Sequence, residues 1–413
     1  MAIVVQKYGG TSVGDTDRLK RVADRIARTH QDGYQTVVVV SAMGKTTDDL
    51  VAMAQRVSER PPERELDILL TAGERISMSL LAMALYERGV PAKSFTGSQA
   101  GIITDAVHGK ARIVDITPGR VKQALEEGNV VIVAGFQGVS QDTKDITTLG
   151  RGGSDTTAVA LAAALAADVC EIYTDVDGVY TADPRIVTDA RKLAYLSYEE
   201  MLELAAQGAK VLQVRSVEFG RNHGVRIHVR SSFSYTTGTW VGPEEDKVED
   251  AIISGVAHDT SEAKVTVHGV PDRPGIAARL FNALADETIN IDMIVQNVAM
   301  AGRTDISFTL PRGETHKAQA VLDPLSGEIG ARGIAVDEDI AKVSLVGAGM
   351  KTHPGVAAKM FSALSAAGVN IEMISTSTIR VSVVVARDQV DTAVRAVHEV
   401  FGLGEELVIE EGA

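Results

Sequence analysis

The chain of 413 residues contains very little cysteine, and its histidines do not cluster. The single cysteine, Cys170, excludes a disulfide bond within the chain, and the surrounding Ala-Asp-Val-Cys-Glu-Ile-Tyr predicts a buried strand that carries a structural thiol. None of the nine histidines falls in an H-E-x-x-H motif or in a paired Cys/His spacing. A dedicated zinc site is therefore not expected, and a metal ion would arrive with a phosphate ligand.

Basic residues and long apolar segments are also scarce. Lysine and arginine number 41 against 55 aspartate and glutamate residues, so the net charge is −14 and no basic patch offsets it. This balance argues against nucleic acid as the main partner. The most apolar helix-like run, 156–167, is shorter than the roughly twenty residues that a membrane span needs, and no secretory signal opens the chain. We expect a cytoplasmic protein without a membrane partner.

The N-terminal segment joins a valine-rich strand to a glycine-rich loop. The strand at 3–5 runs into Lys7-Tyr-Gly-Gly-Thr-Ser-Val-Gly14, which combines one lysine with backbone N–H groups and two hydroxyls. Such a loop suits a phosphate. It is not the G-x-G-x-x-G fingerprint, and Gly44-Lys45-Thr46 is not a Walker A motif, because Val39 stands where the first glycine is required. Taken alone, the loop is either an anion cradle or simply a tight turn.

Short β-branched runs alternate with longer helix-like stretches up to about residue 230. Strands are expected at 36–40, 130–134, 169–174 and 226–230, and helices at 48–56 and 64–88. This alternation predicts an α/β fold with a mainly parallel sheet and helices on both faces. Ligands gather beyond the carboxyl ends of the strands of such a sheet. Polar clusters follow the expected strand ends at 7–15, 41–48, 135–147 and 174–184.

A second glycine-rich segment runs from Thr148 to Ala158 and leads into the alanine-rich helix. Gly152 and Gly153 allow close backbone approach, and Ser154 or Asp155 can cap the helix and direct its positive end at an anion. Arg151 adds a guanidinium fork that suits a carboxylate. Two such loops can clamp one polyphosphate, which favours the anion cradle at the N-terminus.

The last third of the chain contains an internal repeat, preceded by a polar stretch at 231–250 that is typical of a domain junction. Segment 264–275 matches 342–355, and further pairs lie 80 residues apart: Phe281 with Phe361, Asn290 with Asn370 and Ile291 with Ile371. Each copy reads as strand, Pro-Gly turn, amphipathic helix and second strand. This pattern resembles the ACT domain, a βαββαβ module that binds amino acids in many regulated enzymes. The alternative is a ferredoxin-like interaction domain without a ligand.

Five segments together resemble the aspartokinases, members of the amino acid kinase family, over essentially the whole chain. They are 7–13, 40–47, 71–77, 150–158 and 173–185. The resemblance implies an α/β, amino acid kinase-like three-layer sandwich with a mainly parallel sheet, followed by two ferredoxin-like βαββαβ ACT domains. The implied domains are 1–245 for catalysis, 246–335 for the first ACT domain and 336–413 for the second, with a strand near 251–257 that could instead join the second.

The resemblance implies phosphorylation of the β-carboxylate of L-aspartate by Mg²⁺-ATP, which gives 4-phospho-L-aspartate. This is the first step of lysine, threonine, methionine and isoleucine biosynthesis. A carboxylate is already ionised at neutral pH, so the reaction requires no general base. Alignment of the reactants and stabilisation of charge should therefore supply the catalysis.

The resemblance also assigns roles to individual residues. The catalytic residues would be Lys7, which neutralises charge on the transferred phosphoryl group, and Asp155, which organises that lysine or the metal ion. Aspartate would bind to Thr47, Glu74, Arg151 and Ser154, with Glu74 on its ammonium and Arg151 on its α-carboxylate. ATP would contact Lys7, Gly9, Gly10, Ser12, Ser41, Ser154, Thr174, Asp175, Tyr180, Arg185 and Lys210. No dedicated metal ligand is assigned.

Lysine and threonine are the implied effectors, bound where ACT domains meet in a homodimer or an α2β2 assembly. In the first repeat the corresponding positions are Asp272, Pro274, Gly275, Asn290, Ile291, Asp292 and Gln296. In the second they are Val369, Asn370, Ile371, Ser375, Thr376, Ser377 and Thr378. Backbone amides at the Pro-Gly turns would take the effector carboxylate, and Asp292 would hold an ammonium.

Two departures from the family pattern predict reduced or altered feedback inhibition. Thr378 stands where the family usually has a glutamate, and the segment around 299–303 is shorter than usual. Val248 stands where some relatives restart translation with methionine to make a separate subunit.

Two other functions stay open. The first is a kinase for another acceptor, such as glutamate or a nucleotide. The second is an inactive, amino-acid-binding regulatory protein, against which the intact Lys7, Glu74, Arg151 and Asp155 argue.

Overall fold

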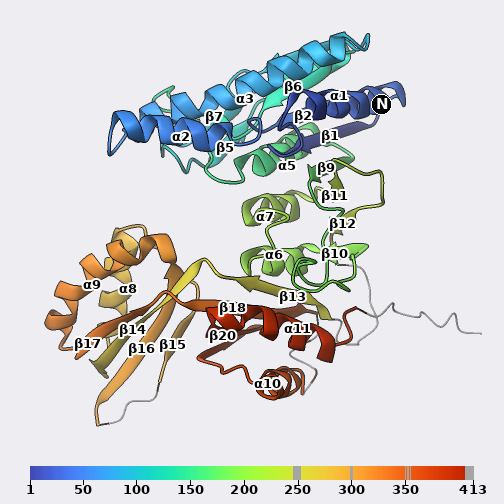
Figure 1. Ribbon diagram of the computed structural model, residues 1–413. Coiled ribbons are helices and arrows are strands. Elements are labelled where there is room, and N and C mark those ends of the chain that lie inside the picture. The colour runs from blue at the N-terminus through green and yellow to red at the C-terminus, as the bar shows by residue number, and fades with distance from the viewer. Residues whose placement is uncertain (245–252, 298–300, 349, 351–352, 354, 405–413) are drawn as a thin grey trace, which may run out of the picture. The chain divides into compact units, whose positions relative to one another are not determined.

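The computed structural model describes residues 1–244, 253–297, 301–348, 350, 353 and 355–404. Val248 and residues 299 and 300 of the shortened segment lie outside the described residues. The chain divides into two compact units, each described by itself below (Figure 1). Unit 1 comprises Met1–Val179, Lys192–Ala205 and Lys210–Asp246, and unit 2 comprises Tyr180–Arg191, Ala206–Ala209 and Lys247–Ala413.

An eight-stranded sheet forms the centre of unit 1. The strands lie in the order β10 (Tyr195–Ser197), β12 (Thr239–Gly242), β11 (Ile227–Ser231), β9 (Val169–Thr174), β1 (Ile3–Tyr8), β2 (Gln35–Val40), β6 (Val130–Ala134) and β3 (Ala92–Phe95). All neighbours pair in parallel except β11 and β12. The continuous valine runs of β2 and β6 suit central strands because both of their faces are buried. The predicted mainly parallel sheet is confirmed.

Helices cover both faces of this sheet. The helices of unit 1 are α1 (Thr16–Gln31), α2 (Thr46–Val57), α3 (Glu63–Tyr86), α4 (Gly119–Glu126), α5 (Gly153–Leu165), α6 (Tyr198–Ala206) and α7 (Val214–His223), of which α6 ends one residue inside unit 2. Figure 1 shows α1 and α3 on one face and α5 on the other. Val38 and Val40 pack in one core cluster with residues of α1 and α3, whereas Val39 lies near the start of α5. This alternation along β2 follows from the two-residue repeat of a strand and produces the expected three layers.

Helix α3 is long and apolar enough to cross a membrane by length and composition alone. The run at 156–167, which the sequence analysis describes as the most apolar, lies mostly in the shorter helix α5. The buried stripe of α3 includes Asp67 and Glu74, and α3 packs against β6 and α1. These contacts make α3 a core helix of unit 1.

A second, smaller sheet of unit 1 has the order β5 (Ile113–Ile116), β4 (Ile102–Thr104), β7 (Gln137–Ser140), β8 (Ile146–Thr148). Strands β7 and β8 form an antiparallel hairpin, and β8 leads directly into the loop before α5. This sheet therefore places the second glycine-rich loop.

Unit 2 contains the two repeats, each built around a four-stranded sheet. The first comprises β14 (Glu262–Pro271), α8 (Ile276–Asp286), β15 (Ile294–Gln296), β16 (Arg303–Pro311), the short helix η1 (Arg312–Glu314), α9 (Thr315–Ile329) and β17 (Gly333–Asp337). The second comprises β18 (Ile340–Gly347), α10 (Val356–Ala366), β19 (Met373–Thr376), β20 (Arg380–Ala386), η2 (Arg387–Gln389) and α11 (Val390–Val400). Its fourth strand is β13 (Ile253–Asp259), which pairs with β18 and precedes the whole first repeat in sequence.

Two short segments that the sequence assigns to the catalytic domain pack with unit 2 instead. In Tyr180–Arg191, Ala182 and Val187 join the core of the second repeat, and the carbonyl of Thr181 accepts a hydrogen bond from the backbone N–H of Val256 at 2.7 Å. In Ala206–Ala209, a buried glutamine accepts a hydrogen bond from Ser344 at 2.9 Å. Burial of these side chains against β13 and β18 explains the difference.

Candidate active site

The predicted phosphate loop lies at the carboxyl edge of the large sheet. Strands β1, β2, β6 and β9 are parallel, so the loops that follow them meet at one edge. Strand β1 lies between β2 and β9, and the chain adds later strands on opposite sides of it. This arrangement is a topological switch point, where α/β sheets bind ligands.

The loop after β1 is held close to its neighbours. The backbone N–H of Gly44 donates to the carbonyl of Gly10 at 3.0 Å, and that of Gly9 donates to the carbonyl of Tyr173 at 3.4 Å. A Cβ atom at Gly10 would lie 2.9 Å from the carbonyl oxygen of Ala42, so the approach requires glycine. The Gly-Gly pair is thus packed between the loops that follow β2 and β9.

Lys7 and Asp155 form an ion pair at this edge. The Lys7 Nζ lies 2.6 Å from Asp155 Oδ1, and both side chains are nearly buried. Asp155 belongs to the first turn of α5, whose N-terminus therefore lies beside the loop. The positive end of that helix adds to the attraction for an anion.

The prediction that Ser154 or Asp155 caps α5 is wrong. The N-cap residue is Gly152, which adopts the left-handed conformation at φ 70°, and no side chain caps the helix. The helix begins at Gly153, two residues earlier than a cap at Ser154 requires, because Gly152 tolerates this backbone conformation. Asp155 is then free to pair with Lys7.

Glu74 reaches the same group of loops from α3. Its side chain is buried, and its Oε1 accepts a hydrogen bond from the backbone N–H of Ala42 at 3.0 Å. Its Oε2 is buried and has no hydrogen-bond partner among the described residues. Burial raises the pKa of Glu74 to about 7. A buried carboxylate oxygen without a partner favours a cationic ligand such as an ammonium group.

The remaining predicted substrate and nucleotide residues differ in their exposure. Arg151 is exposed in the loop between β8 and α5, and Thr47 is half-buried in the first turn of α2. Thr174 is half-buried at the end of β9 and donates a hydrogen bond to Asp175 at 3.1 Å. Ser41 is half-buried just after β2.

The three remaining predicted nucleotide residues are divided between the two units. Lys210 is exposed in unit 1, beyond α6. Tyr180 and Arg185 belong to unit 2, and Arg185 is paired with Asp183 at 2.6 Å.

Three residues that sequence reasoning did not assign, Ser232, Ala42 and Gly135, lie against predicted site residues, and Gly73 lies against Ala42. The hydroxyl of Ser232 donates to that of buried Ser12 at 2.6 Å, and the N–H of Ala42 donates to Glu74. Cβ atoms at Gly73 and Gly135 would lie 2.7 Å from Ala42 Cβ and 2.6 Å from Ser154 Oγ. Both glycines fall inside segments that the sequence analysis names, 71–77 and 135–147. Their place in those segments is the sequence signal that could have identified them.

The predicted effector residues occupy equivalent places in the two repeats. Asp272, Pro274 and Gly275 form the turn before α8, Asn290, Ile291 and Asp292 precede β15, and Gln296 ends that strand. Val369, Asn370 and Ile371 precede β19, Ser375 and Thr376 lie in it, and Ser377 and Thr378 lie in the exposed turn after it.

The acidic residues after these Asn-Ile pairs are already engaged. Fully buried Lys342 contacts Asp292 and also lies 2.8 Å from Glu262. The equivalent Lys264 contacts Glu372 of the second repeat. Each repeat thus supplies a lysine to the acid of the other, and Asp292 holds the chain's own ammonium group.

Comparison with known proteins agrees with this geometry. The model of the amino acid kinase family matches residues 2–231, and that of the ACT domain matches residues 265–323 and 343–401. The chain therefore belongs to the amino acid kinase family and carries tandem ACT domains.

Similar proteins narrow the assignment. An aspartokinase of Mycobacterium tuberculosis is 62% identical over 408 residues, which cover 98% of this chain and 97% of the relative. The crystal structure of E. coli aspartokinase III in complex with aspartate and ADP (R-state) has a TM-score of 0.84 at 27% identity and covers 97% of this chain and 100% of that chain. The structure of the same enzyme with lysine and aspartate (T-state) has a TM-score of 0.74 at 28% identity, with coverages of 96% and 99%. Within its family, the chain belongs to the aspartokinases.

Proposed function

We propose that this aspartokinase transfers the γ-phosphoryl group of ATP to the β-carboxylate of L-aspartate at the carboxyl edge of the large sheet. The observation that carries the proposal is the buried Lys7–Asp155 ion pair, together with the unpaired carboxylate oxygen of Glu74. The first supports a site for the transferring phosphate, and the second a site for the ammonium group of an amino acid.

Lys7 stabilises the charge that develops on the transferred group. The N–H group of Gly10 and the start of α5 add donors around it, and Asp155 holds the lysine in place. The β-carboxylate of aspartate is ionised at neutral pH, so it attacks without a general base. The described residues contribute positioning and charge stabilisation.

We propose that Mg²⁺ arrives with ATP and is held mainly by its phosphate oxygens. The described residues contain no group of three or more His, Cys, Asp or Glu side chains that could hold a metal ion by themselves, and Asp155 is the carboxylate beside Lys7. A magnesium site built from one carboxylate and substrate phosphates is usual in kinases. Bound there, the ion would neutralise phosphate charge.

Glu74 and Arg151 recognise the amino acid end of aspartate. Glu74 Oε2 accepts hydrogen bonds from the ammonium group, and Arg151, exposed in the loop between β8 and α5, binds the α-carboxylate. Thr47 and Ser154 complete the orientation of the substrate. The nucleotide residues proposed in unit 1 are Lys7, Gly9, Gly10, Ser12, Ser41, Ser154, Thr174, Asp175 and Lys210. The E. coli relative in complex with aspartate and ADP supports an amino acid and an adenine nucleotide as the ligands.

Trapping the acyl phosphate with hydroxylamine tests the proposal. Purified protein with Mg²⁺-ATP should form a hydroxamate with aspartate and far less with glutamate. A preference for glutamate would indicate another acceptor. Absence of hydroxamate with either substrate would favour the inactive regulatory protein.

We propose lysine, with threonine, as the effector of the ACT domains, acting in a cytoplasmic homodimer or α2β2 assembly. The lysine complex of the E. coli relative supports lysine as an effector. Thr378 lies in the exposed turn after β19, where a glutamate would offer a carboxylate to a cationic effector. We therefore expect weaker lysine inhibition than in relatives that carry the glutamate. Inhibition curves for lysine, threonine and their mixture would measure this.

A further inference from the structure

Helix α3 carries two buried carboxylates on the same face, and the proposed mechanism uses only one of them. Asp67 and Glu74 are seven residues apart, so they lie two turns from each other on the buried stripe of the helix. The side chain of Asp67 is 1% exposed. A charge this deeply buried is costly unless donors surround it.

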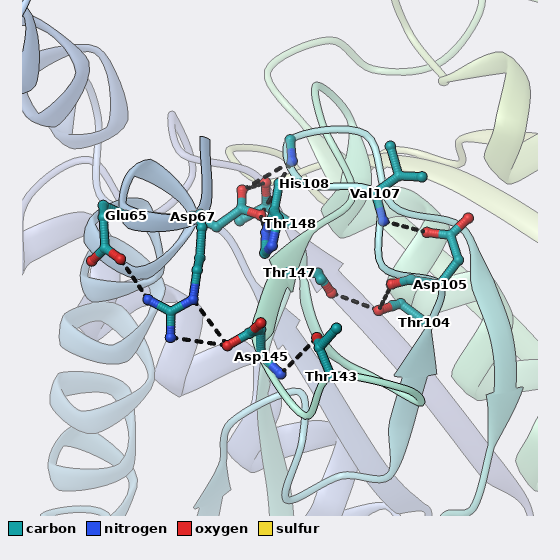
Figure 2. Close-up of polar contacts among 12 residues, drawn as sticks. Glu65, Asp67, Thr104, Asp105, Val107, His108, Thr143, Asp145, Thr147 and Thr148 are labelled. Atoms are coloured by element: carbon teal, nitrogen blue, oxygen red, sulfur yellow. Dashed lines mark hydrogen bonds and ion pairs between the residues drawn. The ribbon is translucent and has the colours of Figure 1, made fainter. Parts of the chain in front are cut away.

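Asp67 accepts hydrogen bonds from three neighbours (Figure 2). The hydroxyl of Thr148 donates to its Oδ1 at 2.5 Å. The backbone N–H of Gly109 lies 3.1 and 3.2 Å from the two oxygens, and Nδ1 of His108 lies 2.7 Å from Oδ2. Among the described residues, none of these donors forms a hydrogen bond with a proposed substrate residue, which by itself would indicate a structural role.

The position of Thr148 connects these hydrogen bonds to the loop that carries Arg151. Thr148 is the last residue of β8 and lies three residues before Arg151. The next residue, Leu149, is held by Arg215, whose Nη1 donates to its carbonyl at 2.7 Å, and it donates its own N–H to the carbonyl of Phe136 at 2.8 Å. The chain is therefore fixed on α3 and its neighbours up to Leu149, and the glycine-flanked turn with Arg151 starts from that point.

We propose that Asp67 is a positioning residue that sets the distance between Glu74 and Arg151. Through Thr148, it fixes the base of the loop that carries Arg151 to the helix that carries Glu74. The two ends of the α-amino acid group of aspartate would then meet their partners at the correct spacing. The inference rests on the roles proposed for Glu74 and Arg151.

The same helix and hairpin provide a matched control contact. Arg64 of α3 forms an ion pair with Asp145, which precedes β8, at 2.9 Å (Figure 2). It joins the same two elements as Asp67 and Thr148, but Arg64 is about half exposed. Exposed ion pairs contribute little, so its loss should leave the loop in place.

The test compares Thr148→Val, Thr148→Ser, Asp67→Asn and Arg64→Gln in the full chain, by initial rates with aspartate and ATP varied separately. Thr148→Val preserves shape but removes the donor, and we expect the KM for aspartate to rise about tenfold, with the KM for ATP within about twofold of the parental value. Asp67→Asn should raise the same KM at least as much. Thr148→Ser keeps the hydroxyl and should recover most of the loss, while Arg64→Gln should match the parental protein.

Equal changes in both KM values, or a lower melting temperature with an unchanged KM for aspartate, would reduce Asp67 to a purely structural role. If Asp67→Asn fails to fold, the isosteric Thr148→Val still decides the question. A parental protein that forms no aspartyl hydroxamate would instead refute the proposed function itself, before any variant is considered.

Discussion

Replacing Glu74 by glutamine tests the proposed ammonium site most directly. Glutamine keeps the shape of the side chain and an oxygen for the backbone N–H of Ala42, but it cannot carry the charge that Oε2 would offer to the substrate. Loss of a buried, charge-assisted hydrogen bond should lower kcat/KM for aspartate by about a hundredfold. The KM for ATP should change little.

The raised pKa of Glu74 also predicts how activity depends on pH. With a pKa of about 7 in the free protein, Glu74 must lose a proton before it can bind an ammonium group. One pH unit below the pKa costs about 1.4 kcal/mol, so kcat/KM for aspartate should fall about tenfold per unit below pH 7 and level off above it. The substrate's own groups do not titrate between pH 5.5 and 8.

The stability of the folded protein should decrease as pH rises, whereas kcat/KM increases. Because the pKa of Glu74 is higher in the folded protein than in the unfolded chain, its contribution is fully present below about pH 4.5 and is lost as pH rises through about 7. The shift from 4.5 to about 7 corresponds to about 3 kcal/mol. Without substrate, Glu74→Gln should therefore be more resistant to denaturant than the parental protein at pH 8, with the difference vanishing toward pH 5.

Initial-rate profiles from pH 5.5 to 8 and denaturant titrations at the two pH extremes would check these expectations. A flat parental profile for kcat/KM, or a Glu74→Gln variant that keeps the rise toward pH 7, would refute the reasoning. The profile for ATP at saturating aspartate is the internal control.

Four further substitutions address other parts of the chain. Lys7→Ala should lower kcat by at least about a thousandfold with the fold intact by circular dichroism, and near-normal turnover would remove its assigned role. Lys342→Met leaves two acids without their buried partner and should cost about 3 to 5 kcal/mol in a denaturant titration. The equivalent Lys264→Met should cost clearly less, because Lys264 is partly exposed; equal losses would contradict this. Thr378→Glu should lower the lysine concentration that gives half inhibition, and an unchanged curve would dismiss that position.

The parallel sheet and the repeat were predictable because they depend on local patterns. Continuous valine runs such as 36–40 indicate strands buried on both faces, and their alternation with helices favours parallel pairing. Glycine pairs after a strand indicate close backbone approach. This prediction is confirmed at Gly10, where a Cβ atom would collide with the carbonyl oxygen of Ala42. The 80-residue spacing of matched residues indicated two similar modules.

Contacts between segments far apart in the sequence could not be predicted from such local patterns. The cap of α5 was predicted wrongly because Ser154 and Asp155 favour N-cap positions locally, whereas Asp155 instead pairs with Lys7, almost 150 residues away. The shared engagement of Asp292 with Lys342 depends likewise on how the two repeats pack. No periodic pattern in the sequence predicts the pairing of Asp155 with Lys7 or of Asp292 with Lys342.

The class of chemistry follows from the amino acid sequence, because each residue type brings its own charge and hydrogen-bonding capacity: one lysine and two glycine-rich loops for phosphate, a glutamate and an arginine for an amino acid. The pKa values and the spacing of those groups depend on the folded chain. Burial of Glu74 raises its pKa, the parallel sheet brings Lys7 to Asp155, and Asp67 ties β8 to the helix that carries Glu74. These effects arise from desolvation and from distances between segments remote in sequence, and a linear chain specifies them only once it has folded.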